Sequence, residues 1–282
     1  MKTYKSLNIN GTAINKEELN NYLEKMAVEY TIVSKSEKDT YPVPELIENL
    51  NEIKRVYNLL NEHVKLGIQI HPAGEWILDN FYVVEEITNQ IKKELTLKKY
   101  MNFVGIANGK YRGFARIYLL AEEIVGYTDC RINKEDLTSY LASYQLKKTL
   151  NMDEIWNVGM FIQIAIIKKI RFIAEKIYET QIQKYKVENI AERLIENKAK
   201  NEMIFKNKNL IQKSKAIEMK YSFIEYMSYI LKKYGKKGYS YLKILEEEVE
   251  KTGTTVTDVI KKEHFNIAIK KVLMANSITS MK

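Results

Sequence analysis

Apolar and polar residues alternate with a helical period along most of this chain, and the breaks between the periodic segments are short. Proline occurs only at positions 42, 44 and 72, and there are only 11 glycines in 282 residues. Both residues interrupt helices, so their scarcity favours long helices over a sheet. The pattern predicts an all-α fold of about ten helices, near residues 16–30, 45–66, 73–94, 112–127, 134–148, 152–180, 183–205, 216–234, 239–251 and 255–274.

Residues that cap helices stand where several of these segments begin or end. A side chain that accepts from backbone amides, followed three residues later by a carboxylate, satisfies the free amide groups of a first helical turn. Glycine just after a helical segment is typical of the residue that ends a helix. The capping pairs are Asn15–Glu18, Asn133–Asp136 and Asn151–Glu154, and the glycines are Gly67, Gly109, Gly235 and Gly253.

The segment from Asp153 onward is apolar on nearly every face. Such a helix is central and buried, so we expect residues 152–180 to form the middle of a multi-helix bundle. The expected organisation is an N-terminal helix and surface loop at 1–44, a helical core module at 45–180 and a basic C-terminal part at 181–282, packed on the core. The apolar residues of the central segment are Trp156, Val158, Phe161, Ile162, Ile164, Ile166, Ile167, Ile170 and Ile173.

Charge is unevenly distributed. Residues 1–183 hold 24 basic and 24 acidic residues, whereas residues 184–282 hold 21 basic against 12 acidic ones, which accounts for the net charge of +9. This is typical of a solvated lysine-rich surface, or of one that faces nucleic acid, anionic lipid or an acidic partner. Residues 239–264 could form a helix-turn-helix, but the second helix carries Asp258 and Glu263 and no arginine for reading bases, which argues against nucleic acid.

The cysteine content and the lengths of the apolar runs bear on the cellular compartment in which the chain is expected. Cys130 is the only cysteine, so no intrachain disulfide can form and a reducing compartment fits best. The longest apolar run, Val158–Ile167, is interrupted by Gln163, whereas a membrane span needs roughly 20 apolar residues. We therefore expect a cytoplasmic chain without a transmembrane segment.

The common catalytic signatures do not occur. A phosphate loop needs four residues between its glycines and Ser or Thr after its lysine, but three residues separate Gly105 from Gly109, and Tyr111 follows the lysine. The three histidines, at 63, 71 and 264, are scattered. There is no Asp-x-Asp element to hold the metal ion of a nucleotide-sugar transferase. We expect no catalytic residue, no metal and no cofactor in this chain.

Aromatic and acidic residues cluster between positions 75 and 86. Carboxylates one helical turn apart repel each other unless cations neutralise them. Two interpretations stay open: a charge network that joins two helices, with Arg112, Arg116 and Arg131 as the cations, or a polar groove in which an aromatic ring stacks on a sugar. Helical spacing puts Glu75, Asp79, Tyr82 and Glu86 on one stripe, and Trp76, Asn80, Val83 and Ile87 on a second stripe that is expected to pack inward.

Four ordered blocks of sequence, at Ala73–Glu86, Gly113–Ala121, Thr128–Arg131 and Met152–Trp156, carry a family resemblance. The first resembles the Ala-Gly-Glu-Trp-Leu-Leu-Asp-Asn element near the start of cyclic β-1,2-glucan synthases. The others are similar to that family's Gly-Tyr-Pro-Arg-Val-Tyr, Thr-Asp-Ser-Arg and Gly-Glu-Leu-Trp elements. Near the end, residues 263–264 and 276–280 resemble a further stretch. The departures are Ala115 for proline, Cys130 for serine, Lys282 for arginine and a looser match over Phe265–Ala275.

The resemblance implies a helical N-terminal module of a very large membrane enzyme that polymerises glucose from UDP-glucose and closes the β-1,2-linked chain into a ring. In that family the transferase domain and membrane helices follow, and a phosphorylase-like glycoside hydrolase domain comes later. The partners it implies are those downstream domains and β-1,2-glucan. The module itself is expected to be non-catalytic and to lie on the cytoplasmic face, scaffolding the transferase or contacting glucan.

Two alternatives stay open. One is a standalone carbohydrate-binding module, and the other is a nucleic-acid-binding helical protein that uses the basic C-terminal third. The candidate ligand or interdomain contacts are Glu75, Trp76, Asp79, Asn80, Tyr82, Arg116, Tyr118, Asp129 and Arg131.

Overall fold

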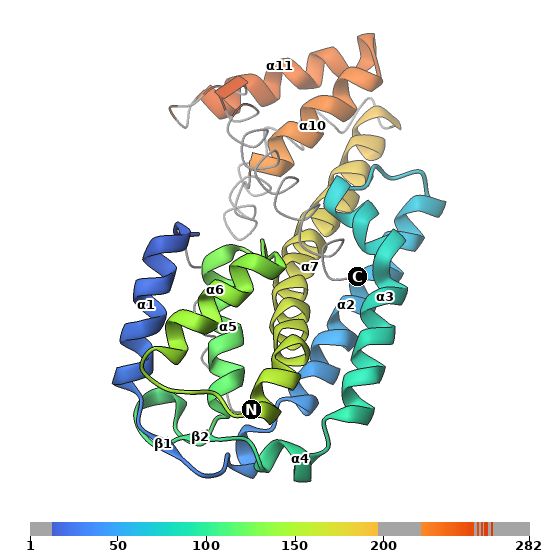
Figure 1. Ribbon diagram of the computed structural model, residues 1–282. Coiled ribbons are helices and arrows are strands. Elements are labelled where there is room, and N and C mark those ends of the chain that lie inside the picture. The colour runs from blue at the N-terminus through green and yellow to red at the C-terminus, as the bar shows by residue number, and fades with distance from the viewer. Residues whose placement is uncertain are drawn as a thin grey trace. The chain divides into compact units, whose positions relative to one another are not determined.

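The computed structural model describes residues 13–196 and 221–250, together with residues 253, 255, 257, 258 and 261. This part of the chain is helical almost throughout, so the predicted all-α class is confirmed (Figure 1). Its α-helices are α1 (Lys16–Glu29), α2 (Val43–Lys65), α3 (Pro72–Glu94), α4 (Leu97–Met101), α5 (Arg116–Thr128), α6 (Lys134–Gln145), α7 (Met152–Glu196), α10 (Tyr221–Lys233) and α11 (Lys236–Glu250).

The predicted caps explain where several helices begin and end. Asn15 and Glu18 form a reciprocal capping box at α1. Asn133 Oδ1 accepts from the amide of Asp136 at the start of α6. Gly67 and Gly235 adopt positive φ angles of 68° and 58° just beyond α2 and α10, the left-handed backbone that ends helices.

Several predicted boundaries differ from the observed ones, and the two largest differences have a cause in the sequence. The helix expected from residue 112 begins at Arg116, because Gly113 has a φ of 88° and cannot continue a right-handed helix. The break expected after residue 180 does not occur, and α7 runs on to Glu196, because the polar residues there include neither glycine nor proline. The helix expected at 255–274 and the blocks at 263–264 and 276–280 lie outside the described residues.

Two short strands and a short helix connect the long helices. Ile32–Val33 (β1) pairs antiparallel with Gly105–Ile106 (β2), with Ile32 opposite Ile106. A side chain at Gly105 would place its Cβ 2.4 Å from the carbonyl oxygen of Lys35, so this glycine permits the close approach of the two segments. Hydrogen bonds from Ser36 to the carbonyl oxygens of Tyr100 and Phe103, and from the amide of Glu37 to the carbonyl oxygen of Gly113, hold the chain after β1 against α4 and the segment that precedes α5.

The described residues form two compact units. Unit 1 comprises residues 13–58 and 76–175, and unit 2 comprises residues 59–75, 176–196 and 221–250. In unit 1 the first part of α7 lies among α2, α3, α5 and α6 (Figure 1), and Phe161 and Ile162 are fully buried there. In unit 2 the end of α7 packs with α10 and α11 around Val187, Ala191, Ile230, Leu231 and Val249.

The central position of α7 in unit 1 agrees with the prediction, but its first turns do not. Trp156, predicted to be part of the core, is 73% exposed. It lies two residues from Glu154, which is fully buried, and residues two apart on a helix face nearly opposite directions. None of the helices in residues 13–196 and 221–250 is long and apolar enough to span a bilayer.

Candidate functional site

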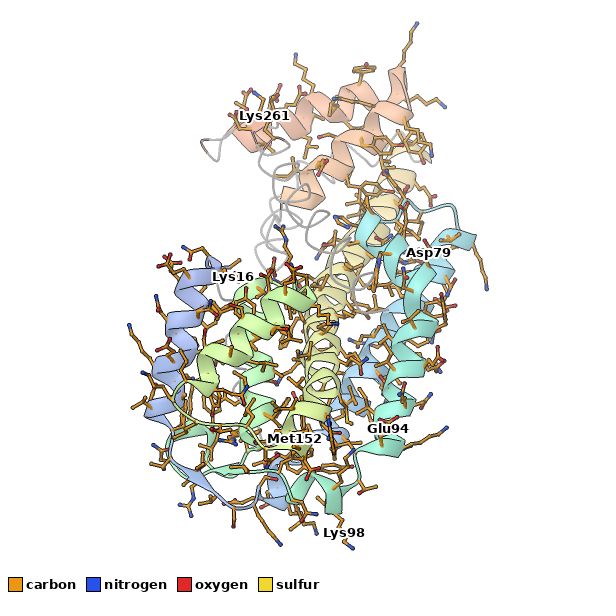
Figure 2. All side chains as sticks on the ribbon, viewed as in Figure 1. Lys16, Asp79, Glu94, Lys98, Met152 and Lys261 are labelled. Carbon is orange, nitrogen blue, oxygen red and sulfur yellow. The ribbon has the colours of Figure 1, made fainter. Side chains whose placement is uncertain are left out.

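The predicted residues on α3 lie at or near the surface. Glu75, Asp79 and Tyr82 are exposed, and Tyr82 is 62% exposed. Over the described residues, the side chains of Asp79 and Glu86 take part in no hydrogen bond or ion pair that would neutralise them. The predicted charge network with arginines of the next helix is therefore wrong. Figure 2 labels Asp79 on the outer side of α3.

The buried face of α3 is not the stripe that the sequence predicted to pack inward. Trp76, Asn80, Val83 and Ile87 are half-buried, and the amide of the Asn80 side chain donates to the carbonyl oxygen of Trp76 at 2.9 Å. The buried row of α3 is Ala73, Ile77, Phe81, Val84, Thr88 and Ile91. Each member of that row follows the last by three or four residues, as one face of a helix requires.

Arg116 forms a buried ion pair that sequence reasoning did not assign. Its Nε donates to Oε1 of Glu154 at 2.7 Å, and its Nη2 donates to Oε2 of the same carboxylate at 2.6 Å. Nη2 also donates to the carbonyl oxygen of Thr149 at 2.8 Å. Arg116 is 5% exposed and Glu154 is fully buried. The bidentate geometry and the burial make this a strong, oriented contact.

Glu154 also caps the start of α7. Its Oε2 accepts from the backbone amide of Asn151 at 2.8 Å, while its own amide donates to the Asn151 side chain at 2.9 Å. One carboxylate thus joins the first turn of α7 to the first turn of α5. Burial lowers the pKa of the Arg116 guanidinium, but hydrogen bonding and attraction to Glu154 raise it by more. The pKa of Arg116 therefore lies above its ordinary value, and the guanidinium stays charged. The block around Arg116 and the block around Glu154, two of those that carry the resemblance, meet here.

A second buried charge cluster lies deeper in unit 1. The Lys168 Nζ of α7 lies 2.8 Å from Oε1 of Glu122 on α5 and 3.1 Å from Oε1 of Glu45 on α2. Burial raises the pKa of Glu122, and the cation of Lys168 lowers it only in part. The Lys168 ammonium also lies 5.9 Å from the ring centre of Tyr118, a predicted site residue that is itself buried.

The turn Thr128–Arg131 ends α5 with two residues in left-handed backbone. Asp129 and Cys130 have φ angles of 49° and 65°, and residues other than glycine seldom adopt such positive values. The Asp129 carboxylate pairs with Lys169 at 3.3 Å, and burial raises the pKa of the Cys130 thiol to about 12. Cys130 is thus an unreactive packed thiol, and Arg131 is exposed.

Two glycines of the resembling blocks have steric roles. A Cβ on Gly74 would lie 2.7 Å from Ile70 Cγ2 and 3.2 Å from a methyl group of Leu60, so this glycine allows the start of α3 to pack against α2. Gly113 combines its positive φ with a carbonyl that accepts from the amide of Glu37 at 2.7 Å. Both positions serve packing and backbone geometry.

The structure therefore does not bring the predicted site residues together in one site. Asp79 and Tyr82 face solvent on α3, whereas Arg116 and Tyr118 face the interior, so the two groups share no ligand surface. Sequence reasoning missed Glu45, Glu122 and Lys168. The signal available for Lys168 was a lysine within the most apolar helix, since a buried lysine requires a carboxylate partner. Within the described ranges, no three His, Cys, Asp or Glu side chains gather as a metal site would need.

These observations describe an all-α module with an interior organised by buried ion pairs. No protein-family model matches the chain. Among curated proteins, the chain is similar to the cyclic beta-(1,2)-glucan synthase NdvB of Rhizobium meliloti (strain 1021), with 25% identity over 236 residues. The matched segment covers 83% of this chain and 8% of that protein. The predicted relation is thus confirmed: the chain is related to a region of that enzyme.

Proposed function

We propose that this chain is a non-catalytic helical module of a cyclic β-1,2-glucan synthase-like glycosyltransferase, and that it positions the transferase domain on the cytoplasmic face of the membrane. The observation that carries the proposal is the Arg116–Glu154 pair. It joins α5 to α7 inside unit 1 through charged residues of two blocks that resemble elements of the synthases, and its burial leaves those groups inaccessible to a substrate.

The exposed part of α3 is the surface we propose for contact with the transferase or with glucan. Asp79 and Tyr82 stand on it, half-buried Trp76 lies at its margin, and the carboxylate of Asp79 has no cation to neutralise it over the described residues. Unneutralised carboxylates and aromatic rings are groups that bind sugar hydroxyls or the side chains of another domain. A surface for positioning needs no chemistry of its own.

The first experiment asks whether the chain alone transfers glucose. The purified chain is incubated with UDP-glucose and a β-1,2-glucan acceptor, and products are separated by mass. We expect no glucosyl transfer, because the described residues include no metal cluster for a diphosphate. Transfer by the purified chain would overturn the non-catalytic role.

The second experiment tests positioning. A cyclic β-1,2-glucan synthase lacking the region matched by this chain is expressed in membranes, and its formation of labelled glucan is compared with that of the intact enzyme. We expect most of the activity to be lost, and to return when the missing region is supplied as a separate chain. Full activity of the shortened enzyme would contradict the proposal.

Contact with glucan is tested on α3. Trp76→Ala and Asp79→Asn are compared with the native chain for binding of β-1,2-linked oligosaccharides and for melting temperature. Weaker binding at an unchanged melting temperature supports a glucan-contacting surface. A lower melting temperature with unchanged binding assigns these residues to the fold and leaves the transferase as the partner of α3.

A further inference from the structure

Exposed apolar side chains gather at one end of unit 1. This end contains β1, β2, α4, the last turn of α1 and the first turns of α5 and α7 (Figure 1). Of the large hydrophobic residues that are exposed in the described part of unit 1, all but Tyr82 belong to segments that meet here. They are Val28, Ile32 and Val33 from the α1–β1 segment, and Leu146, Met152, Ile155 and Trp156 from the α6–α7 segment.

Hydrogen bonds hold these segments together. The ammonium of Lys148, between α6 and α7, donates to the carbonyl oxygen of Tyr30, which directly precedes the β1 segment. Arg116 at the start of α5 contacts Thr149 and Glu154. Met152, Ile155 and Trp156 follow each other at helical spacing, so they form one exposed stripe on the first turns of α7. The apolar residues therefore stand on an ordered surface.

The same end is basic. Its segments, residues 28–41, 92–112 and 146–156, contain ten basic side chains against six acidic ones, and one of the acids is the buried Glu154. Nearly all the bases are lysines, and Lys98 at the start of α4 is exposed; Figure 2 labels Lys98 and Met152 in the lower part of the view. Large apolar side chains beside flexible lysines are the composition of surfaces that rest on anionic lipid.

We propose that this end of unit 1 docks on an anionic membrane surface, with Trp156 and Met152 entering the headgroup region and the lysines meeting lipid phosphates and carboxylates. Charge complementarity favours this occupant over a second copy, because two copies facing each other through this end would oppose like charges. Protein interfaces are depleted in lysine, which favours lipid over a protein partner. The proposal is independent of the proposed function, since it concerns the chain and lipid alone.

The experiment measures co-sedimentation of the full chain with phosphatidylcholine vesicles, with and without phosphatidylserine. We expect binding only to the anionic vesicles, weakened by salt. Lys98→Glu should weaken binding about tenfold, because the change removes one attraction to the anionic surface and adds one repulsion. Trp156→Ser should also weaken binding about tenfold by removing the largest inserted side chain.

Two matched controls separate this end from the general basicity of the chain. Lys134→Glu also replaces an exposed lysine in the first turn of a helix, and Tyr82→Ser also removes an exposed aromatic ring. Both should leave binding within about twofold, because both lie away from this end. Acidic residues are favourable in a first helical turn, so neither lysine variant should impair folding.

Three outcomes would overturn the proposal. One is no binding of the native chain to phosphatidylserine vesicles. Another is equal weakening by Lys98→Glu and Lys134→Glu, which would assign the attraction to overall charge. The third is a dimer in sedimentation analysis that Trp156→Ser abolishes while vesicles are not bound, since this would make the same end an interface between copies.

Discussion

Unit 1 and unit 2 both bury polar side chains, but they satisfy them differently. In unit 1, Arg116 meets Glu154 and Lys168 meets Glu122 and Glu45, with distances between 2.6 and 3.1 Å. The buried charged side chains of the described residues lie in unit 1, whereas unit 2 buries neutral polar groups such as His63 and Gln181. Buried polar atoms without a hydrogen-bond partner occur in both units, on Asn20 and Glu122 in unit 1 and on His63, Gln181 and Gln183 in unit 2. Removing one member of a buried ion pair leaves an unpaired charge, whereas an unpaired neutral atom is already a cost to the native state.

The difference indicates where each unit is sensitive. In unit 1, the packing of α2, α5 and α7 against one another depends on a few buried charged side chains that connect these helices. Unit 2 depends on an apolar cluster, and no ion pair is among its described polar contacts. The Tyr226 hydroxyl donates to Oε1 of Glu188 at 2.6 Å, and Gln181 Nε2 and Lys184 Nζ both donate to the carbonyl oxygen of Gln69, at 3.0 and 3.3 Å. We therefore expect unit 1 to respond strongly to single charge changes, and unit 2 to lose stability as the pH falls through the range in which His63 titrates.

The largest expected effect is on the Arg116–Glu154 pair. Arg116→Ala should lower the free energy of unfolding by about 3–5 kcal/mol, because Glu154 is left charged and buried. Chemical denaturation monitored by circular dichroism measures the loss. The matched control is Lys54→Ala, which removes an exposed partner of Glu85 at 3.3 Å and should cost at most about 1 kcal/mol. Equal losses from the two variants would refute the special role of the buried pair.

The second effect concerns Lys168, and its size is expected to depend on pH. Lys168→Met leaves Glu122 and Glu45 facing each other, and burial already raises the pKa of Glu122 above its ordinary value of 4.5. A raised pKa of an acid in the folded state means that stability is present at low pH and is lost as pH rises. The destabilisation, of about 2–4 kcal/mol at pH about 8, should therefore shrink at pH about 4.5. A loss independent of pH would show that packing, and not the unpaired carboxylates, is responsible.

A smaller effect is expected at His63 in unit 2. Its imidazole is buried, stacks on Tyr185 with ring centres 5.7 Å apart, and has a pKa lowered by burial, which the nearby Glu62 offsets only in part. A lowered pKa of a base in the folded state means that stability is present above the ordinary value of 6.5 and is lost as pH falls. Hydrogen exchange should report faster opening of residues 176–190 as the pH is lowered from about 7 to about 5.

His63→Phe should abolish that acid response while changing stability at neutral pH by about 1 kcal/mol or less. Unit 1 provides the internal reference, because His63 does not belong to it. If His63→Phe left the acid response of residues 176–190 unchanged, the response would have to come from other groups.

The smallest effect is expected on α3. Asp79→Asn and Tyr82→Ala should each change the free energy of unfolding by about 0.5 kcal/mol or less, because both side chains are exposed. Thermal unfolding measures this. A loss above about 1 kcal/mol would place these residues in the fold and weaken α3 as a contact surface.

Local sequence signals predicted the elements well. The capping pairs at Asn15 and Asn151 and the glycine after α2 were readable because caps and turn glycines act within a few residues of each other. The four resembling blocks were recognisable for the same reason, and the relation to a glucan synthase region followed from them. What these signals did not contain was the partner of each charged residue.

By itself, then, the sequence determined an all-α fold, most helix boundaries and the family relation, since each depends on contacts within a turn or on short ordered motifs. Only the tertiary structure decided that Arg116 serves Glu154, 38 residues away, and not the carboxylates of α3. Only it placed Trp156 outside the core and Lys168 inside it. Helical periodicity tells which residues share a face, but the neighbour that covers a face is fixed by the packing of distant helices.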